Sequence, residues 1–166
     1  MIGLATAIDG ANPHDLWERL DAAALPMFGL GRSGLHEQAA ALAETITTRL
    51  RLQPTAAGGG ELLLHRALSS GLAHPLLLAT LAHELARRAG IRSAVARYGN
   101  SFWTALISDD AYLPIGFGPP APLAAQELRA CCAHHIAREM LSAIAATAPA
   151  AQARRADQLR LAVRHV

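Results

Sequence analysis

Lysine is absent from this chain of 166 residues, and aromatic residues make up only 4% of it. All fifteen basic residues are therefore arginine, and they are scattered along the chain rather than gathered into one patch. With a formal net charge of +2, the chain offers little electrostatic attraction to nucleic acid. Because 52% of the residues are hydrophobic while aromatic residues are scarce, we expect a core of Ala and Leu, which is typical of closely packed helices.

Cysteines and long apolar runs are scarce as well. The two cysteines, Cys131 and Cys132, are adjacent, which makes them poor candidates for a disulfide with each other and favours a reducing compartment. No uninterrupted run reaches the roughly 18 apolar residues that a membrane helix needs. The first residues lack the basic region of a signal peptide and reach Asp9 early. These features predict a cytoplasmic protein that does not bind membranes.

The stretch from His74 to Ile91 is apolar on nearly every side, which predicts a helix that is buried all round. Pro75 suits the first helical position, where a backbone N–H would have no partner in any case. Arg87 and Arg88 fall in the last turn, and Gly90 supplies the left-handed residue that commonly ends a helix. We expect this helix to form the centre of the fold.

Helices are predicted before this stretch, and strands after it. Asn12 and Pro13 begin a helix that ends before Pro26, residues 34–50 carry one apolar helical face, and residues 61–68 form a short helix. Strands are expected at residues 91–98, 101–107 and 112–116. The second strand is apolar on both faces and so lies in the middle, while Pro114 places the third at an edge.

The last third of the chain predicts a helical hairpin. Apolar spacing from Leu123 through Cys132 to Ile144 indicates one long helix, and another helix follows Pro149. We therefore expect a single, mostly helical α+β domain over residues 1–166. Its parts are amino-terminal helices in 1–70, a core helix packed on a three-stranded antiparallel sheet in 71–118, and the hairpin in 119–166.

Three motifs occur in a recognisable order: SSGLAHPLLLATLAHELARRAGI, then GNSF, then YLPIGFG. This order resembles the SirB-type branch of the transglutaminase-like superfamily, where a buried helix ending in Arg-Arg-x-Gly precedes a Pro-Gly-His-Phe strand. The hairpin is similar to the tetratricopeptide-like tail of such proteins. The resemblance implies a transglutaminase-like, or papain-like, core in which the buried helix packs on the sheet.

The resemblance also implies a catalytic Cys, His and Asp, at positions that here hold Pro75, Ser101 and Pro114. None of these three can act as nucleophile, base or carboxylate. We therefore expect a degenerate, non-enzymatic protein without a cofactor, which binds a protein or small-molecule ligand in the groove between helix and sheet. The candidate groove residues are His74, Ser101 and Trp103, although Trp103 fits the core equally well.

Two other classes of function remain open, an enzyme with relocated residues and an interaction scaffold that works through the hairpin. A hydrolase could use His74 with Ser101, although Ser101 lacks a G-x-S-x-G setting. His83 and Glu84 begin like a zinc-protease helix, but Arg87 stands where the second histidine is needed.

A metal enzyme is the other form of the enzyme hypothesis. Cys131, His135 and Glu139 recur every four residues along the predicted helix, so they would share one stripe that could bind Zn²⁺. A site on a single helix needs a further ligand from elsewhere in the chain. The candidates for that ligand are His65, His83 and His165.

Overall fold

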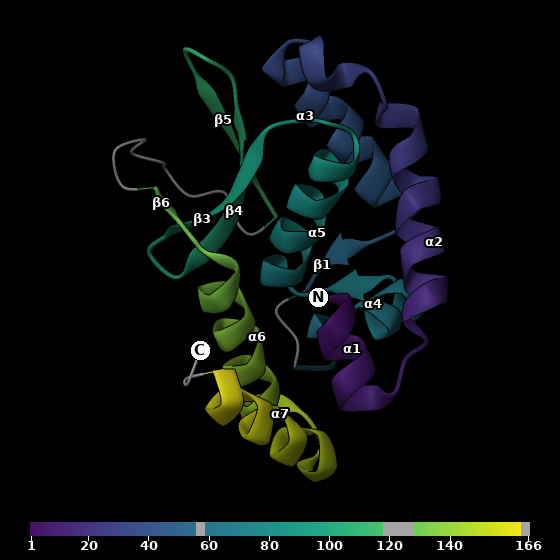
Figure 1. The fold of residues 1–166 in the computed structure, drawn as a ribbon, viewed down its shortest axis with the longest axis vertical. Helices are drawn as coiled ribbons and strands as arrows, with labels where there is room; N and C mark the ends of the chain where they lie inside the picture. Colours follow the sequence, from purple (N-terminus) through teal and green to yellow (C-terminus); the bar gives the residue numbers. More distant parts are fainter. Residues whose placement is uncertain (56–58, 118–127, 164–166) are drawn as a thin grey trace.

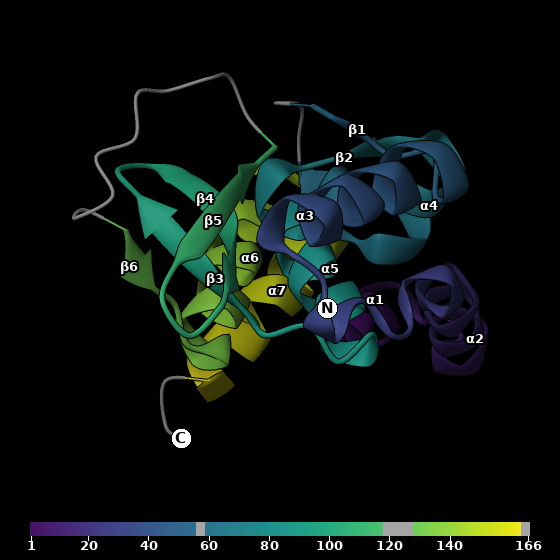
Figure 2. The same ribbon diagram turned by 90° about the horizontal axis from the view of Figure 1, so that it is seen from above.

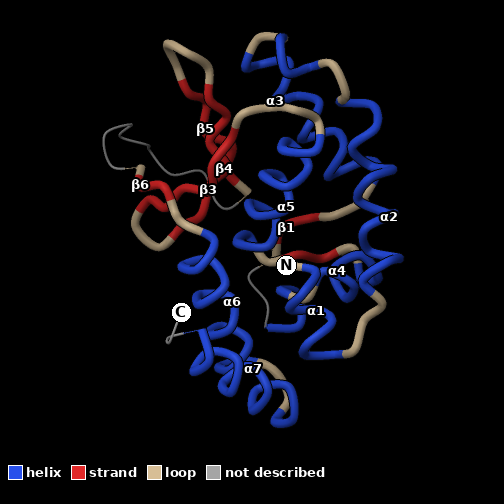
Figure 3. The backbone as a smooth tube through the Cα atoms, viewed as in Figure 1, coloured by secondary structure: helices blue, strands red, loops and turns tan. Residues whose placement is uncertain are grey.

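The computed structural model describes residues 1–55, 59–117 and 128–163. The protein has an α+β fold that is mostly helical, with one small antiparallel sheet (Figure 1). Figure 3 shows the strands of this sheet grouped on one side of the molecule and most of the helices on the other. Among the described residues, no helix combines the length and apolar character needed to cross a membrane.

The amino-terminal part is helical, as predicted. It contains α1 (Ile2–Asp9), α2 (Pro13–Ala24), α3 (Leu35–Glu44) and α4 (Leu64–Ser70), the 3-10 turns η1 (Leu25–Met27), η2 (Leu30–Arg32) and η4 (Gly59–Leu62), and a π-helical turn η3 (Thr45–Arg49). Asn12 caps α2, because its side chain accepts a hydrogen bond from the His14 N–H at 3.0 Å. Helix α1 is an addition to the predicted elements.

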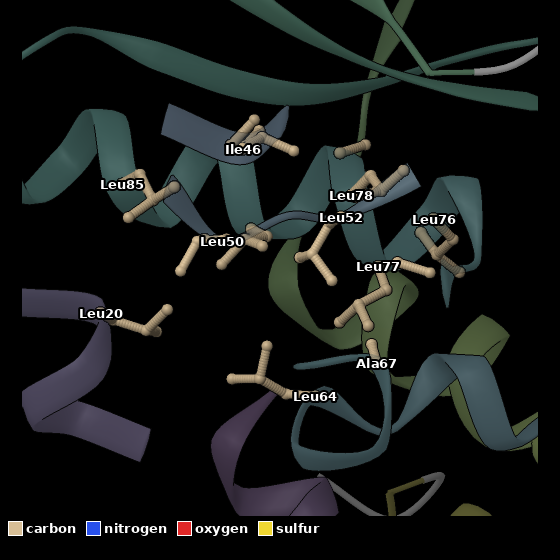
Figure 4. Close-up of a cluster of buried hydrophobic side chains, with 14 of the residues drawn as sticks. Leu20, Ile46, Leu50, Leu52, Leu64, Ala67, Leu76, Leu77, Leu78 and Leu85 are labelled. Carbon is tan, nitrogen blue, oxygen red and sulfur yellow. The ribbon is translucent and has the colours of Figure 1, made fainter. Parts of the chain in front are cut away.

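Helix α5, Pro75–Arg88, confirms the prediction of a buried central helix. Its N-cap is His74, whose Nδ1 accepts a hydrogen bond from the Leu76 N–H at 3.1 Å. Gly90 follows the helix with a φ of 73°. Glycine adopts this left-handed conformation at little cost because it has no Cβ atom. Figure 4 shows the α5 leucines among apolar side chains of α2 and α4, including Leu20 and Leu64.

The main sheet has four strands, in the order β5-β4-β3-β6, where three were predicted. The strands β3 (Ser93–Tyr98), β4 (Ser101–Ile107) and β5 (Tyr112–Gly116) confirm the three predicted ones. As expected, β4 is an interior strand and β5, which contains Pro114, lies at an edge. Two further short strands, β1 (Gln53–Pro54) and β2 (Leu72–Ala73), pair in parallel away from this sheet.

The fourth strand, β6 (Arg129–Ala130), lies in a segment that was predicted to be helical, so that prediction was wrong there. Leu128, Cys132 and Ile136 have helical spacing, but the backbone of this segment pairs with β3 instead. The Cys131 N–H donates to the Val95 carbonyl at 2.8 Å. Periodicity could not distinguish these arrangements, because a short strand can occupy one turn of an apparently helical pattern.

The carboxyl-terminal hairpin consists of α6 (Ala133–Thr147) and α7 (Ala150–Val163), which pack against each other (Figure 1). Helix α6 begins later than predicted, and the predicted start at Leu123 lies outside the described residues. Cys132 is the N-cap of α6, and its Sγ accepts a hydrogen bond from the His135 N–H at 3.4 Å. Helix α7 also packs on α1, so the hairpin is joined to the amino-terminal helices.

The two faces of the main sheet differ in what they contact. Thr104 faces α5, because its Oγ1 donates a hydrogen bond to the Ala79 carbonyl at 2.8 Å. Leu106 lies on the same face and belongs to the hydrophobic core. Because side chains alternate along a strand, Ser101 and Trp103 lie on the opposite face. Figure 2 shows α3 and α5 together on one side of the sheet.

Candidate functional site

The structure does not bring the three predicted groove residues together. His74 is half-buried at the start of α5, whereas Ser101 and Trp103 lie on the sheet face that points away from α5. Trp103 is 9% exposed, and a Cβ atom placed on Gly116 would be only 2.2 Å from its ring. The Trp103 ring therefore covers the neighbouring strand β5 and does not line a groove with His74.

The three positions that match the catalytic triad lie at the start of α5, at the start of β4 and within β5. Pro75 is the first residue of α5, Ser101 is the first residue of β4, and Pro114 pairs with Ala105 in β5. Neither proline carries a group that can transfer a proton, and the Ser101 hydroxyl lies on the sheet face opposite α5. The hydrolase hypothesis that pairs His74 with Ser101 is not supported either, because the sheet lies between the two side chains.

The proposed metal stripe does not form on one helix. Cys131 precedes α6, while His135 and Glu139 lie on α6 with Nε2 and Oε1 3.9 Å apart. The Glu139 carboxylate also lies 3.9 Å from the Arg97 guanidinium. Within residues 1–55, 59–117 and 128–163, no three His, Cys, Asp or Glu side chains are grouped so that they could hold a metal ion.

The histidines that were candidates for an additional ligand have other positions. His65 lies 3.1 Å from the Asp9 carboxylate, and the predicted candidate His165 lies outside the described residues. His83 is the residue of interest, because its ring contacts the hydroxyl of Ser93.

A pocket of about 570 Å³ lies between α1, α5, β3 and α6, and we call it the α5–α6 pocket. Its volume falls within the range of small-molecule sites, and its lining is largely apolar. Trp17 of α2 contributes to the lining although it is 44% exposed, which places an aromatic ring at the solvent side. The apolar part of the wall is made by Met1, Ile2, Val95, Ile136, Ala137 and Met140.

His83 and Ser93 form the polar centre of the α5–α6 pocket. The His83 Nδ1 atom and the Ser93 Oγ atom are 2.9 Å apart, and both residues are half-buried. Burial lowers the pKa of His83 below its usual 6.5, the charge of Glu84 raises it, and the charge of Arg87 lowers it. Near neutral pH the imidazole is therefore uncharged and can accept the hydroxyl proton of Ser93.

Glu84 adds one fixed negative charge to the same pocket. Burial alone raises its pKa, but the hydrogen bond from Arg87 and the charges of Arg88 and Arg87 outweigh this effect and lower the pKa. Its Oε1 lies 2.8 Å from Arg87 and 3.0 Å from Arg88. The Arg88 guanidinium in turn stacks on the Trp17 ring at 4.5 Å. These contacts hold Glu84 and Trp17 in place.

Cys131 also faces the α5–α6 pocket, and its chemistry differs from that of an active-site cysteine. Burial raises the pKa of its thiol, and although Arg97 opposes this effect, the net shift is upward. A raised pKa keeps the sulfur protonated near neutral pH, and the protonated thiol is a weak nucleophile. Ser93 with His83 is therefore the better-placed reactive group of the pocket.

The sequence contained little signal for this site. His83 stands out in the sequence only in a zinc-protease pattern and as a candidate further ligand for the Cys131 metal stripe, and nothing in the sequence points to Ser93. The two residues are ten positions apart and belong to a helix and a strand, so neither helical nor strand spacing relates them. They meet only because β3 folds back along α5.

Comparisons with known proteins give no independent assignment: this chain matches no family model, no curated protein and no solved structure. The functional argument therefore depends on the geometry and chemistry of the α5–α6 pocket.

Proposed function

We propose that this protein is a binding module whose α5–α6 pocket holds a small, largely apolar ligand. The observation that carries this proposal is the pocket itself, with a volume of about 570 Å³ and a mainly apolar wall. Its polar groups are few: Thr80, His83 and Glu84 of α5, Ser93 of β3, Cys131 and the amino group of Met1. A mainly apolar wall with a few polar groups is the usual design of a small-molecule site, where the polar groups orient the ligand.

We also propose that the fold is a degenerate relative of the transglutaminase-like superfamily. Support comes from the order of its elements, in which the buried helix α5 is followed by the antiparallel strands β3, β4 and β5. Further support comes from Pro75 and Gly90, which bound α5 at the places that the resemblance implies. On this proposal transglutaminase chemistry was lost with the triad, and binding moved to the neighbouring α5–α6 pocket.

The binding proposal is tested by filling the pocket from α6. Ala137 lines the pocket, so Ala137→Phe should occupy part of its volume. The probe is N-phenyl-1-naphthylamine, an uncharged apolar dye whose fluorescence rises in apolar surroundings. We expect saturable binding to the wild-type protein and an affinity at least about tenfold weaker in the variant, which corresponds to about 1.4 kcal/mol.

The matched control is Ala146→Phe, which makes the same change at an exposed position of the same helix. This variant should bind the dye as the wild type does, and circular dichroism should show both variants folded. Equal binding by the wild type and the folded Ala137→Phe variant would place the dye elsewhere and contradict the proposal.

A further inference from the structure

We propose that Ser93 is a nucleophile and His83 its general base, so that the α5–α6 pocket cleaves uncharged carboxylic esters with a small apolar acyl group. This inference rests on the proposed ligand pocket and adds a reaction to it. The pair comes from two different elements, α5 and β3, and its 2.9 Å separation is the distance at which a hydroxyl proton can pass to an imidazole.

The reaction can be written with these two residues and water. The Ser93 Oγ atom attacks the ester carbonyl carbon while its proton passes to Nδ1 of His83. The bond between the carbonyl carbon and the alcohol oxygen then breaks, and the alcohol leaves with the proton from His83. Water attacks the acyl-serine and gives a proton to His83, the bond from Oγ to the acyl carbon breaks, and Oγ takes that proton as the carboxylic acid departs.

The edge of β3 beside Ser93 offers backbone donors for the negative oxygen that develops during attack. The Ile107 N–H bonds to the Arg92 carbonyl, and the Cys131 N–H bonds to the Val95 carbonyl. Arg92 therefore directs its peptide groups towards β4, and by alternation Ser93 and Val95 direct theirs towards the β6 side. Among the described residues, the bonds from β6 and Cys131 reach β3 only as far as Val95, and none of them pairs with the edge at Ser93.

The lining of the pocket determines the class of substrate. Val95, Ile136 and Met140 make an apolar wall beside the pair, which suits a short hydrocarbon acyl group. The Glu84 carboxylate lies in the same pocket, but it is already paired with Arg87 and Arg88 and also interacts with the buried Met1 amine, so it leaves a charged substrate no free partner. An uncharged ester fits both conditions.

The experiment uses a biotin-linked alkyl fluorophosphonate, which modifies activated serines, together with p-nitrophenyl butyrate as substrate. Trypsin cuts after Arg92 and Arg97, so modified Ser93 is identified in the peptide 93–97 by mass spectrometry. We expect labelling of Ser93 in the wild type and none of that peptide in Ser93→Ala. In the His83→Gln variant, the rate of Ser93 labelling should fall by about 10²-fold or more, which is the usual contribution of a general base.

The labelling rate should also report the base. Burial lowers the pKa of His83, Glu84 and Arg87 act on it in opposite directions, and the resulting pKa lies below 6.5. The other titratable groups of the pocket are the Met1 amine, whose pKa burial lowers from 8.0, and the Cys131 thiol, whose pKa burial raises. The rate should therefore rise with pH as His83 loses its proton, in a step centred below pH 6.5. Ser101→Ala is the matched control, because Ser101 is also half-buried in a strand, and this variant should keep the wild-type rate.

Dye binding measured on the same preparations separates this inference from the proposed function. A wild-type protein that binds N-phenyl-1-naphthylamine but is not labelled at Ser93 would overturn the esterase inference alone. A wild-type protein that neither binds the dye nor becomes labelled would overturn both. Labelling at a serine other than Ser93 would also overturn the inference.

Discussion

Thr104 is a fully buried polar residue at the contact between β4 and α5. Its side chain is 0% exposed, and its Oγ1 donates to the Ala79 carbonyl at 2.8 Å. This hydrogen bond satisfies the hydroxyl, which would otherwise cost free energy in an apolar contact. It also shows which face of β4 turns towards the helix, so it decides the placement of Ser101 and Trp103.

Replacing Thr104 with Val should lower the free energy of unfolding by about 1–2 kcal/mol, because the shape is kept while a buried hydrogen bond is lost. Thr47→Val is the control, since Thr47 donates a similar bond to the Ala43 carbonyl at 2.7 Å but is exposed. Its effect should stay within about 0.5 kcal/mol. Urea unfolding measures the free energy of unfolding of both variants. An equal loss in Thr104→Val and Thr47→Val would show that the contact of β4 with α5 is weaker than its geometry indicates.

Helix α5 is the element on which the rest of the fold packs. It contacts β3, β4 and β5 on the side of the sheet and α2, α3 and α6 elsewhere. Most of its residues are consequently buried, and its polar residues Thr80, His83 and Glu84 line the α5–α6 pocket. The same helix thus forms the core and supplies the general base of the proposed reaction.

The change Leu81→Asp should unfold the protein. Leu81 is 0% exposed in α5, and an unpaired carboxylate buried there costs several kcal/mol against a total stability of about 5–15 kcal/mol. Leu161→Asp makes the same chemical change at a position that is 52% exposed in α7, and it should leave the protein folded. Far-ultraviolet circular dichroism compares the two, and a folded, soluble Leu81→Asp protein would contradict the central position of α5.

At the scale of the whole molecule, Asp9 connects segments that are far apart in the chain. Its carboxylate, 11% exposed, lies 3.1 Å from His65 and 2.5 Å from Arg66 of α4. It also accepts a hydrogen bond from Gln152 of α7 at 2.7 Å, while Arg155 of α7 donates to the Ile8 carbonyl. These contacts hold α1, α4 and α7 together, and α1 in turn contributes to the α5–α6 pocket.

Asp9→Asn should therefore loosen the hairpin as well as lower stability. The amide cannot accept hydrogen bonds from all of the same donors, and we expect a loss of about 1–3 kcal/mol with faster amide hydrogen exchange in α1 and α7. Asp157→Asn is the control, because Asp157 makes an exposed pair with Arg160 that contributes at most about 1 kcal/mol. Unchanged exchange in α7 of the Asp9→Asn protein would mean that apolar packing alone holds the hairpin.

Local signals in the sequence determined the individual elements. Pro75 and Gly90 bound α5, Asn12 caps α2, and the breaks around residues 99–100 and 108–111 separate the three predicted strands. Each signal acts within a few residues through backbone geometry or capping, so it can be recognised without knowledge of the rest of the fold.

Tertiary structure alone decided which surfaces meet. The segment at residues 129–130 became a strand because the edge of β3 was available to it, and Trp103 points away from α5 because Thr104 takes the inner position. His83 and Ser93 became neighbours only when β3 packed along α5. Hydrophobic spacing identifies the apolar side of an element but does not identify its packing partner, and both the four-stranded sheet and the α5–α6 pocket depend on that choice.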